Sequence, residues 1–370
     1  MTDAATRPIG GGRGLAHWAR RAAALSLYAS AWLLFVVTLP LALPLAAAVD
    51  LARGGRRWAT LRCWAFLLLY LSCELAGVVA AAALWLGHRL TFGRGRRQTP
   101  AARLTGLPDA YLRANFRLQR WWARTLFAGA SRIFAMRTTI EGDEAVRRGP
   151  FLLLLRHASI GDTVLPAVYV SDRHDLMLRY VMKRELLWDP CLDIVGNRLP
   201  NYFVQRGSGE SEREVEAVQR LLDHLGPDDG VLIYPEGTRV SPAKRARALE
   251  RLRGVAPPAL LAIAEQLRHT LPPRLGGTLG LLERNPGLDA VFCAHTGFEG
   301  AATFGSLLDG ALIDRHVRVA FWRVPFAQIP TEPAARAEWL YRQWLRIDDW
   351  IAAARGEPAA ALPRRDAATG

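Results

Sequence analysis

Two long apolar segments open the chain, and shorter apolar runs separated by helix-like stretches follow. Residues 22–49 carry no charged side chain, and residues 63–87 carry only Glu74. At about 1.5 Å per residue, either segment is long enough as a helix to cross a bilayer core of about 30 Å. The pattern predicts an N-terminal membrane hairpin with basic flanks over residues 1–100, kinked in its first arm at Pro40 and Pro44.

Arginine clusters lie before, between and after the two segments, so the charges do not by themselves fix how the hairpin sits in a membrane. The two outer clusters together contain more arginines than the cluster between the segments. If the hairpin spans the membrane with these outer clusters on the cytoplasmic side, the C-terminal part of the chain lies in the cytoplasm. A hairpin lodged in one leaflet puts every cluster at one surface. Glu74 favours that arrangement, because a carboxylate at the bilayer centre costs about 2.5–3.5 kcal/mol. Both arrangements remain open, whereas a cleaved signal peptide is disfavoured by the length of the first segment and by the second one.

The remaining chain predicts one α/β domain over residues 101–355. Residues 101–137 have apolar and aromatic side chains near helical spacing, which indicates an amphipathic helix. Short apolar runs predict strands at residues 151–155, 175–182, 230–234, 289–293 and 317–324. Helices are predicted between and after them, at 211–225, 242–267 and 333–355. Alternation of this kind predicts a mixed, largely parallel sheet flanked by helices. Residues 356–370 are expected to form a flexible tail.

The composition narrows the possible partners. Lys and Arg total 48 against 34 Asp and Glu, a net charge of +14, which suits either nucleic acid or an anionic membrane. With 51% hydrophobic residues the chain is not a disordered protein. Its four cysteines show no metal-binding spacing, so no metal is expected. The apolar hairpin and the absence of a nucleic-acid motif favour the membrane, and the alanine and arginine bias suggests a bacterial source.

The first candidate for chemistry follows the apolar run at 151–155. His157 precedes Asp162 by five residues, and the carboxylate can hold the imidazole so that its other nitrogen acts as a general base. The spacing alone is weak, since His224 and Asp229 repeat it in a polar turn that we expect to be solvated. Loops at strand ends are where α/β sheets place their sites, which favours the first copy. Taken alone, His157 could equally be a structural histidine.

The second candidate is Pro235-Glu236-Gly237-Thr238-Arg239, directly after the run at 230–234. The glycine lets a ligand approach the backbone closely. The guanidinium of Arg239 offers a fork suited to phosphate. Glu236 is expected to position that arginine or a substrate hydroxyl. A turn with a surface ion pair is the structural alternative.

Together these segments resemble a family, the membrane-bound glycerolipid acyltransferases that include 1-acylglycerol-3-phosphate acyltransferases. His157–Asp162 matches the family's His-x4-Asp, and Pro235–Arg239 matches its Pro-Glu-Gly-Thr-Arg. Between them, the segment around Lys183 and the Phe-Val-Gln-Arg206 segment resemble its middle block, although Gln205 stands where Asp is common. The Leu-Pro-Pro-Arg segment at 271–274 is closest to the lysocardiolipin and lysophosphatidylinositol acyltransferase branch. The resemblance covers residues 138–330 and implies a glycerol-3-phosphate acyltransferase-like fold.

The resemblance implies an O-acyltransferase with no cofactor, in which acyl-CoA or acyl-carrier protein donates an acyl chain to lysophosphatidic acid or a related lysophospholipid. His157 would remove the acceptor's hydroxyl proton and Asp162 would hold His157. Lys183, Arg206 and Arg239 would bind the acceptor phosphate, in a pocket shaped by Glu236, Gly237 and Thr238. The expected location is the bacterial inner membrane, with the catalytic domain facing the cytoplasm and anionic lipids as further partners. The oligomeric state is left open.

Two alternatives to this function are a non-catalytic membrane scaffold on the same fold and, less favoured, a basic nucleic-acid-binding protein. A further question concerns the basic helix at 242–267. Its cations either form a solvated face or contact anionic lipid or the phosphates of an acyl-CoA donor.

Overall fold

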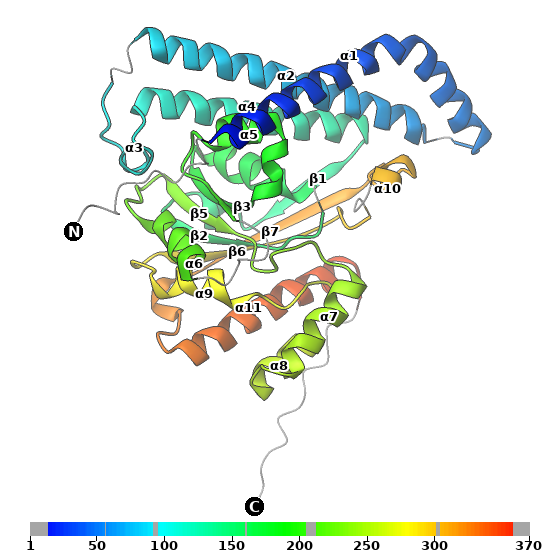
Figure 1. Cartoon of the computed structure of the whole chain (residues 1–370). Coiled ribbons are helices and arrows are strands. Elements are labelled where there is room, and N and C mark those ends of the chain that lie inside the picture. The colour runs from blue at the N-terminus through cyan, green and yellow to red at the C-terminus, as the bar shows by residue number, and fades with distance from the viewer. Residues whose placement is uncertain are drawn as a thin grey trace, which may run out of the picture.

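The computed structural model describes residues 14–55, 57–91, 95–159, 161–204, 212–300 and 304–357. Its two N-terminal helices, α1 (Leu15–Ala52) and α2 (Ala59–Leu90), form the predicted hairpin, and both are long and apolar enough to cross a membrane. α1 continues through Pro40 and Pro44 and bends along its length (Figure 1). At the turn, the Asp50 carboxylate accepts the N–H groups of Thr60 and Leu61, both at 3.0 Å, which satisfies donors at the start of α2.

The hairpin lies against the rest of the protein through α4 (Asp109–Ile133), the main part of the predicted amphipathic stretch. α3 (Pro100–Thr105) and α4 are separated by a turn at Gly106. Glu74, in the middle of α2, is fully buried, and its carboxylate accepts hydrogen bonds from Trp122 Nε1 at 2.8 Å and from the backbone N–H of Cys191 at 3.1 Å. The one charge of the second apolar segment therefore points into the protein.

A seven-stranded sheet forms the centre of the described domain, in the order β1-β7-β6-β2-β5-β3-β4. All neighbouring strands are parallel except β6 and β7, which confirms the predicted mixed, largely parallel sheet. The strands are β1 (Arg137–Glu141), β2 (Phe151–Leu155), β3 (Met177–Lys183), β4 (Tyr202–Val204), β5 (Asp229–Ile233), β6 (Asp289–Thr296) and β7 (His316–Val324).

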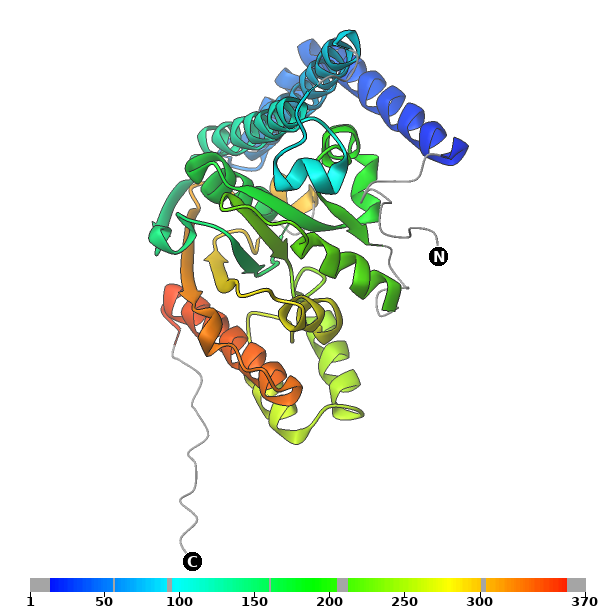
Figure 2. The ribbon, with the colours of Figure 1, turned by 90° about the vertical axis from the view of Figure 1, so that its left-hand side faces the viewer.

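Helices cover both faces of this sheet (Figure 1, Figure 2). Alternate residues of the fully buried β2 point to the two faces, so Leu153 packs on the side of α4 and the hairpin, and Leu154 on the side of α11. The other helices are α5 (Pro190–Gly196), α6 (Glu212–Gln219), α7 (Pro242–Arg253), α8 (Pro258–Gln266), α9 (Leu275–Glu283), α10 (Phe304–Leu308) and α11 (Pro333–Ala354).

The structure differs from the sequence prediction in the helix at 242–267 and in two strands, β1 and β4. The helix expected over 242–267 is two helices, because Pro257 and Pro258 interrupt it and the second begins at Pro258. Strands β1 and β4 were not predicted; β1 alternates exposed and half-buried residues at one edge, and β4 has only three residues. The expected flexible tail lies outside the described residues from residue 358 onward.

Candidate active site

The site lies where neighbouring parallel strands end at the same edge of the sheet. β2 ends just before His157, β5 just before the Pro235–Arg239 segment, and β3 at Lys183. These three strands are adjacent in the order β2-β5-β3 and run in the same direction, so their C-terminal ends meet. The fold thus brings together segments that are far apart in the sequence.

His157 and Asp162 face each other as the spacing predicted. The imidazole Nδ1 lies 3.0 Å from Asp162 Oδ1, and the other oxygen, Oδ2, accepts the backbone N–H groups of Ala158 at 2.6 Å and Ser159 at 2.7 Å. Since a carboxylate only accepts, Nδ1 carries the proton in the neutral ring and Nε2 offers a lone pair. The loop that follows β2 folds around the Asp162 carboxylate, which fixes the imidazole's orientation.

Asp162 is fully buried between two histidines. Nε2 of His295, from β6, lies 3.5 Å from Asp162 Oδ2 and 3.2 Å from the carbonyl oxygen of Arg156. Burial by itself would raise the pKa of Asp162, but the hydrogen bond from His157 and the nearby imidazoles hold that pKa below its ordinary value. Burial lowers the pKa of His295, so this ring is neutral and its Nε2–H points toward two acceptors.

Glu236 joins the two predicted motifs through backbone contacts. Its carboxyl oxygens accept the N–H of His157 at 3.1 Å and the N–H of Leu271 at 3.0 Å, and the residue is 1% exposed. Burial raises its pKa to about 8, against the lowering effect of the Arg156 charge and the two backbone bonds. We expected this carboxyl group to position Arg239 or a substrate hydroxyl. It instead holds the loop that contains His157 and the loop that contains Leu271 together.

The turn after Glu236 brings Thr238 and Arg239 to the site. Gly237 has a φ of +63°, and a Cβ there would lie 2.9 Å from Cδ of Arg274, so both backbone conformation and space favour glycine. Lys244 donates to the Thr238 hydroxyl at 3.1 Å and to the carbonyl oxygen of Arg239 at 3.0 Å. A lysine from α7 thus supports the turn that presents Arg239.

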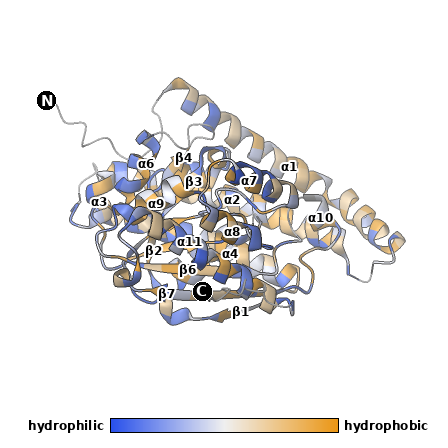
Figure 3. Ribbon diagram, turned by 90° about the horizontal axis from the view of Figure 1, so that it is seen from below, coloured by the Kyte–Doolittle hydropathy of each residue, from blue (hydrophilic) through white to orange (hydrophobic). Residues whose placement is uncertain are grey.

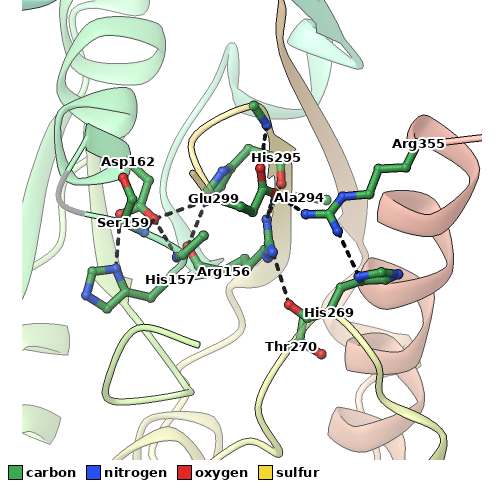
Figure 4. Close-up of polar contacts among 12 residues, drawn as sticks. Arg156, His157, Ser159, Asp162, His269, Thr270, Ala294, His295, Glu299 and Arg355 are labelled. Carbon is green, nitrogen blue, oxygen red and sulfur yellow. Dashed lines mark hydrogen bonds and ion pairs between the residues drawn. The ribbon is translucent and has the colours of Figure 1, made fainter. Parts of the chain in front are cut away.

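Arg156, directly before His157, connects the end of β2 to the end of β6 and to the loop that contains His269 (Figure 4). Its fully buried guanidinium donates to the carbonyl oxygens of His295 at 2.6 Å and His269 at 3.0 Å, and forms an ion pair with Glu299 at 2.7 Å. Glu299 also pairs with Arg355 near the end of α11, at 3.2 Å. This network fixes the backbone from which His157 projects.

A single cavity of about 1980 Å³ receives the predicted residues. It is lined by His157, Lys183, Glu236, Gly237, Thr238 and Arg239, while Asp162 lies behind His157. At one end it reaches hairpin residues, including Tyr28 and Tyr70, and at the other it reaches α7. Arg206, the remaining predicted phosphate ligand, lies outside the described residues.

The sequence analysis did not identify His295 and Arg156 as site residues, and it considered Lys244 only as one cation of the basic helix at 242–267. Arg156 and Lys244 stand beside or close after the two motifs, and proximity alone could have marked them. His295 had no local signal, because only the pairing of β6 with β2 brings it to Asp162. The expected solvation of the second His-x4-Asp copy is wrong for Asp229, which is buried and bonded at 2.8 Å to the buried Arg179.

Comparisons with known proteins agree with the motifs. Residues 137–272 match the family model described as Acyltransferase. 1-acyl-sn-glycerol-3-phosphate acyltransferase epsilon of Mus musculus is 26% identical over 164 residues, which are 44% of this chain and 44% of that protein, so the chain spans less than half of the relative it matches. Among solved structures, the 1-acyl-sn-glycerophosphate (LPA) acyltransferase PlsC from Thermotoga maritima is 15% identical with a TM-score of 0.47, over 79% of this chain and 98% of that one. The predicted resemblance to the glycerolipid acyltransferases is confirmed.

Proposed function

We propose that this chain, with its acyltransferase-family segment, is a membrane-bound O-acyltransferase that moves an acyl chain from a thioester to the hydroxyl of lysophosphatidic acid or a related lysophospholipid. The observation that carries the proposal is the 3.0 Å contact between His157 Nδ1 and Asp162 Oδ1, beside a cavity that also receives Arg239. An oriented imidazole and a phosphate-binding cation in one cavity suit an acceptor that has both a hydroxyl and a phosphate.

In the proposed reaction, Nε2 of His157 takes the hydroxyl proton as the acceptor oxygen attacks the thioester carbon. Asp162 stabilises the imidazolium that forms, as the carboxylate does in a hydrolase triad. The new C–O bond replaces the C–S bond, and the departing thiolate takes the proton from the imidazolium. The acceptor itself is the nucleophile, so the step needs no acyl-enzyme intermediate and no cofactor.

The acceptor phosphate is assigned to the cations at the ends of β3 and β5. Lys183, at the end of β3, and Arg239, in the turn after the adjacent β5, both line the cavity. We keep Arg206 in the same role from its motif. Gly237 and Thr238 shape the turn from which Arg239 extends. Glu236, between the end of β5 and this turn, bonds to the backbone of the His157 loop. The donor is a thioester of coenzyme A or of acyl-carrier protein.

For the membrane, we favour a hairpin lying in one leaflet over one that spans the bilayer. α2 contacts the domain along its length: Arg62 donates to a carbonyl oxygen at the end of α4, Glu74 is bonded to Trp122, and Arg198 donates to the carbonyl oxygen of Ala81 at 2.9 Å. A spanning α2 would have to give up these bonds and expose Glu74 to hydrocarbon. The apolar residues on the outer side of α1 remain available to lipid.

Labelling of single cysteines tests this placement, since all four native cysteines are buried. Arg57→Cys at the hairpin turn should react with an impermeant maleimide from the same side of the inner membrane as Arg342→Cys on α11. That side is expected to be the cytoplasmic one. Reaction of the turn from the opposite side would establish a spanning hairpin.

The enzymatic proposal is tested with the full chain in mixed lipid vesicles, given a panel of lysophospholipids and an acyl thioester. We expect thiol release matched by diacyl product, and for Arg239→Ala a higher KM for the acceptor with little change in the KM for the donor. Failure of the intact protein to acylate any acceptor would favour the scaffold alternative. An unchanged acceptor KM in the variant would refute the role of Arg239 alone.

A further inference from the structure

The site cavity has two chemically different ends on opposite faces of the sheet. One end is lined by Tyr28 and Tyr70 of the hairpin and by Trp122 of α4. The other is lined by α7, which lies with α8 beside α11 on the far side of the sheet from the hairpin (Figure 1, Figure 2). A ligand entering by the second end therefore comes from the side away from the proposed membrane surface.

The α7 end of the cavity carries a row of cations. Lys244, Arg247 and Arg251 are three and four residues apart, which places them on one face of the helix, and all three line the cavity. Hydrophilic residues predominate in α7 (Figure 3). Arg274 lines the cavity as well. The acidic residues that line this region are Glu214 and Glu250, and Glu250 pairs with Arg253 at 3.3 Å.

The row begins at the catalytic loop. The N–H of Val240 donates to the carbonyl oxygen of His157 at 3.2 Å, and Lys244 donates to the carbonyl oxygen of Arg239. The Ser241 hydroxyl then caps α7. From Lys244, Arg247 and Arg251 lie about 4.5 Å and about 10 Å further along the helix axis. The cations thus lead away from His157 toward solvent along one wall of the cavity.

Arg247 and Arg251 differ from the other arginines of α7 in their partners. Arg245 donates to the carbonyl oxygen of Glu265 at 3.0 Å, and Arg253 pairs with Glu250 and Glu265, both at 3.3 Å. Arg247 and Arg251 are exposed, and Nε of Arg251 donates only within α7, to the carbonyl oxygen of Arg247 at 3.2 Å. Within the described residues neither guanidinium has a carboxylate within ion-pair distance. Two guanidinium charges at the solvent end of the cavity are therefore available to an anionic ligand.

We propose that Arg247 and Arg251 form a subsite for the nucleotide phosphates of a coenzyme A thioester, which enters from the α7 end while the lysophospholipid enters from the hairpin end. This inference rests on the proposed function and extends it to the donor. A coenzyme A thioester has its reactive carbon and its phosphates at opposite ends of a flexible arm. His157 and the two arginines are likewise separated along this cavity, so the reactive carbon can reach His157 while the phosphates contact the arginines. Anionic lipid is disfavoured as the ligand because α7 faces away from the hairpin.

The test compares two double variants of the full-length protein that lose the same charge. Arg247→Gln with Arg251→Gln removes the subsite, and Arg253→Gln with Arg342→Gln removes two exposed arginines that do not line the cavity. Because charged hydrogen bonds to phosphate are worth about tenfold each in affinity, we expect the KM for acyl-CoA to rise about 10- to 100-fold in the first variant only. Its kcat and its KM for the same acyl chain on pantetheine should not change.

Calorimetric binding of free coenzyme A to each protein gives a readout that needs no turnover, and it should weaken by a similar factor only in the first variant. An unchanged acyl-CoA KM, an equal rise with the pantetheine thioester, a loss confined to acyl-carrier protein, or a loss confined to binding of anionic vesicles would each overturn the subsite. If the intact protein binds coenzyme A through these arginines but transfers no acyl chain, the proposed function fails while the subsite stands.

Discussion

Two segments of this chain share the spacing His-x4-Asp but lie at opposite edges of the sheet. His157 and Asp162 follow β2 at its C-terminal end, whereas His224 and Asp229 lead into β5 at its N-terminal end. In the first, the carboxylate bonds to the imidazole at 3.0 Å. In the second, Asp229 bonds at 2.8 Å to Arg179, and His224 contributes its carbonyl oxygen to the same guanidinium at 2.7 Å.

Strand direction, rather than spacing, decides the surroundings of these two pairs. At the C-terminal edge, the loop after β2 closes on its own aspartate beside a cavity. At the other edge, the turn before β5 closes around a buried cation, and the exposed His224 ring is directed elsewhere. The proposed function uses the first pair to move a proton, whereas the second pair holds a turn.

Replacing His157 should reduce activity far more than replacing His224. His157→Ala should lower kcat by about 10²- to 10⁴-fold, because a positioned general base contributes in that range, while the protein still reaches the membrane. His224→Ala serves as the control and should retain full activity. The measurement is thiol release with a lysophospholipid acceptor. Equal activities of the two variants would remove the distinction between the segments.

Replacing each of the two aspartates by asparagine should reduce a different property, the turnover rate for Asp162 and the stability for Asp229. Asp162→Asn should lower kcat by about 10²- to 10³-fold, since an amide can present the wrong group to Nδ1 of His157. Asp229→Asn should leave kcat nearly unchanged but reduce the free energy of unfolding by about 3 kcal/mol, because it leaves Arg179 buried without its charged partner. Denaturant unfolding and steady-state kinetics on both proteins check this; a kcat loss in the Asp229 variant would contradict it.

Glu236 should make the stability of the protein depend on pH. Its pKa of about 8 in the folded protein exceeds the ordinary value of 4.5, so the folded state keeps a proton that the unfolded state loses. Stability from this group therefore falls as pH rises from about 4.5 to 8, by at most about 1.4 kcal/mol per pH unit.

Glu236→Gln should remove that dependence, and the difference in unfolding free energy between the two proteins isolates it from other titrations. The variant is expected to be less stable than the wild type at pH 5, where one backbone N–H loses its acceptor, and to close the gap toward pH 8. A constant difference across this range would exclude a protonated Glu236.

The smallest expected effect concerns His295, which has no counterpart at Asp229. His295→Leu removes the ring that lies 3.5 Å from Asp162 Oδ2, and we expect a loss in kcat of about tenfold with both KM values unchanged. His295→Gln keeps an N–H near the position of Nε2 and should recover most of the rate. Equal losses in both variants would indicate a packing role instead.

The strands that could be predicted from the sequence are the buried ones, because a buried strand consists of a run of apolar residues. Residues 151–155 are buried on both faces and form one apolar run, so β2 was predicted residue for residue. β1 lies at an edge and alternates exposed and half-buried positions, and β4 is too short to show a pattern, so neither was found. The double proline that divides α7 from α8 was present in the sequence but outweighed by helical composition on both sides.

The amino-acid order by itself determined the two apolar helices, the central strands and the two motifs that contain His157, Asp162 and Arg239, because these depend on local hydrophobicity and on residue type. Only the tertiary structure decided which His-x4-Asp pair meets a cavity, that His295 stands behind Asp162, and that α7 lies opposite the hairpin. These relations arise from strand pairing between segments more than 100 residues apart and from the packing of helices on the two faces of one sheet, which local sequence patterns do not encode.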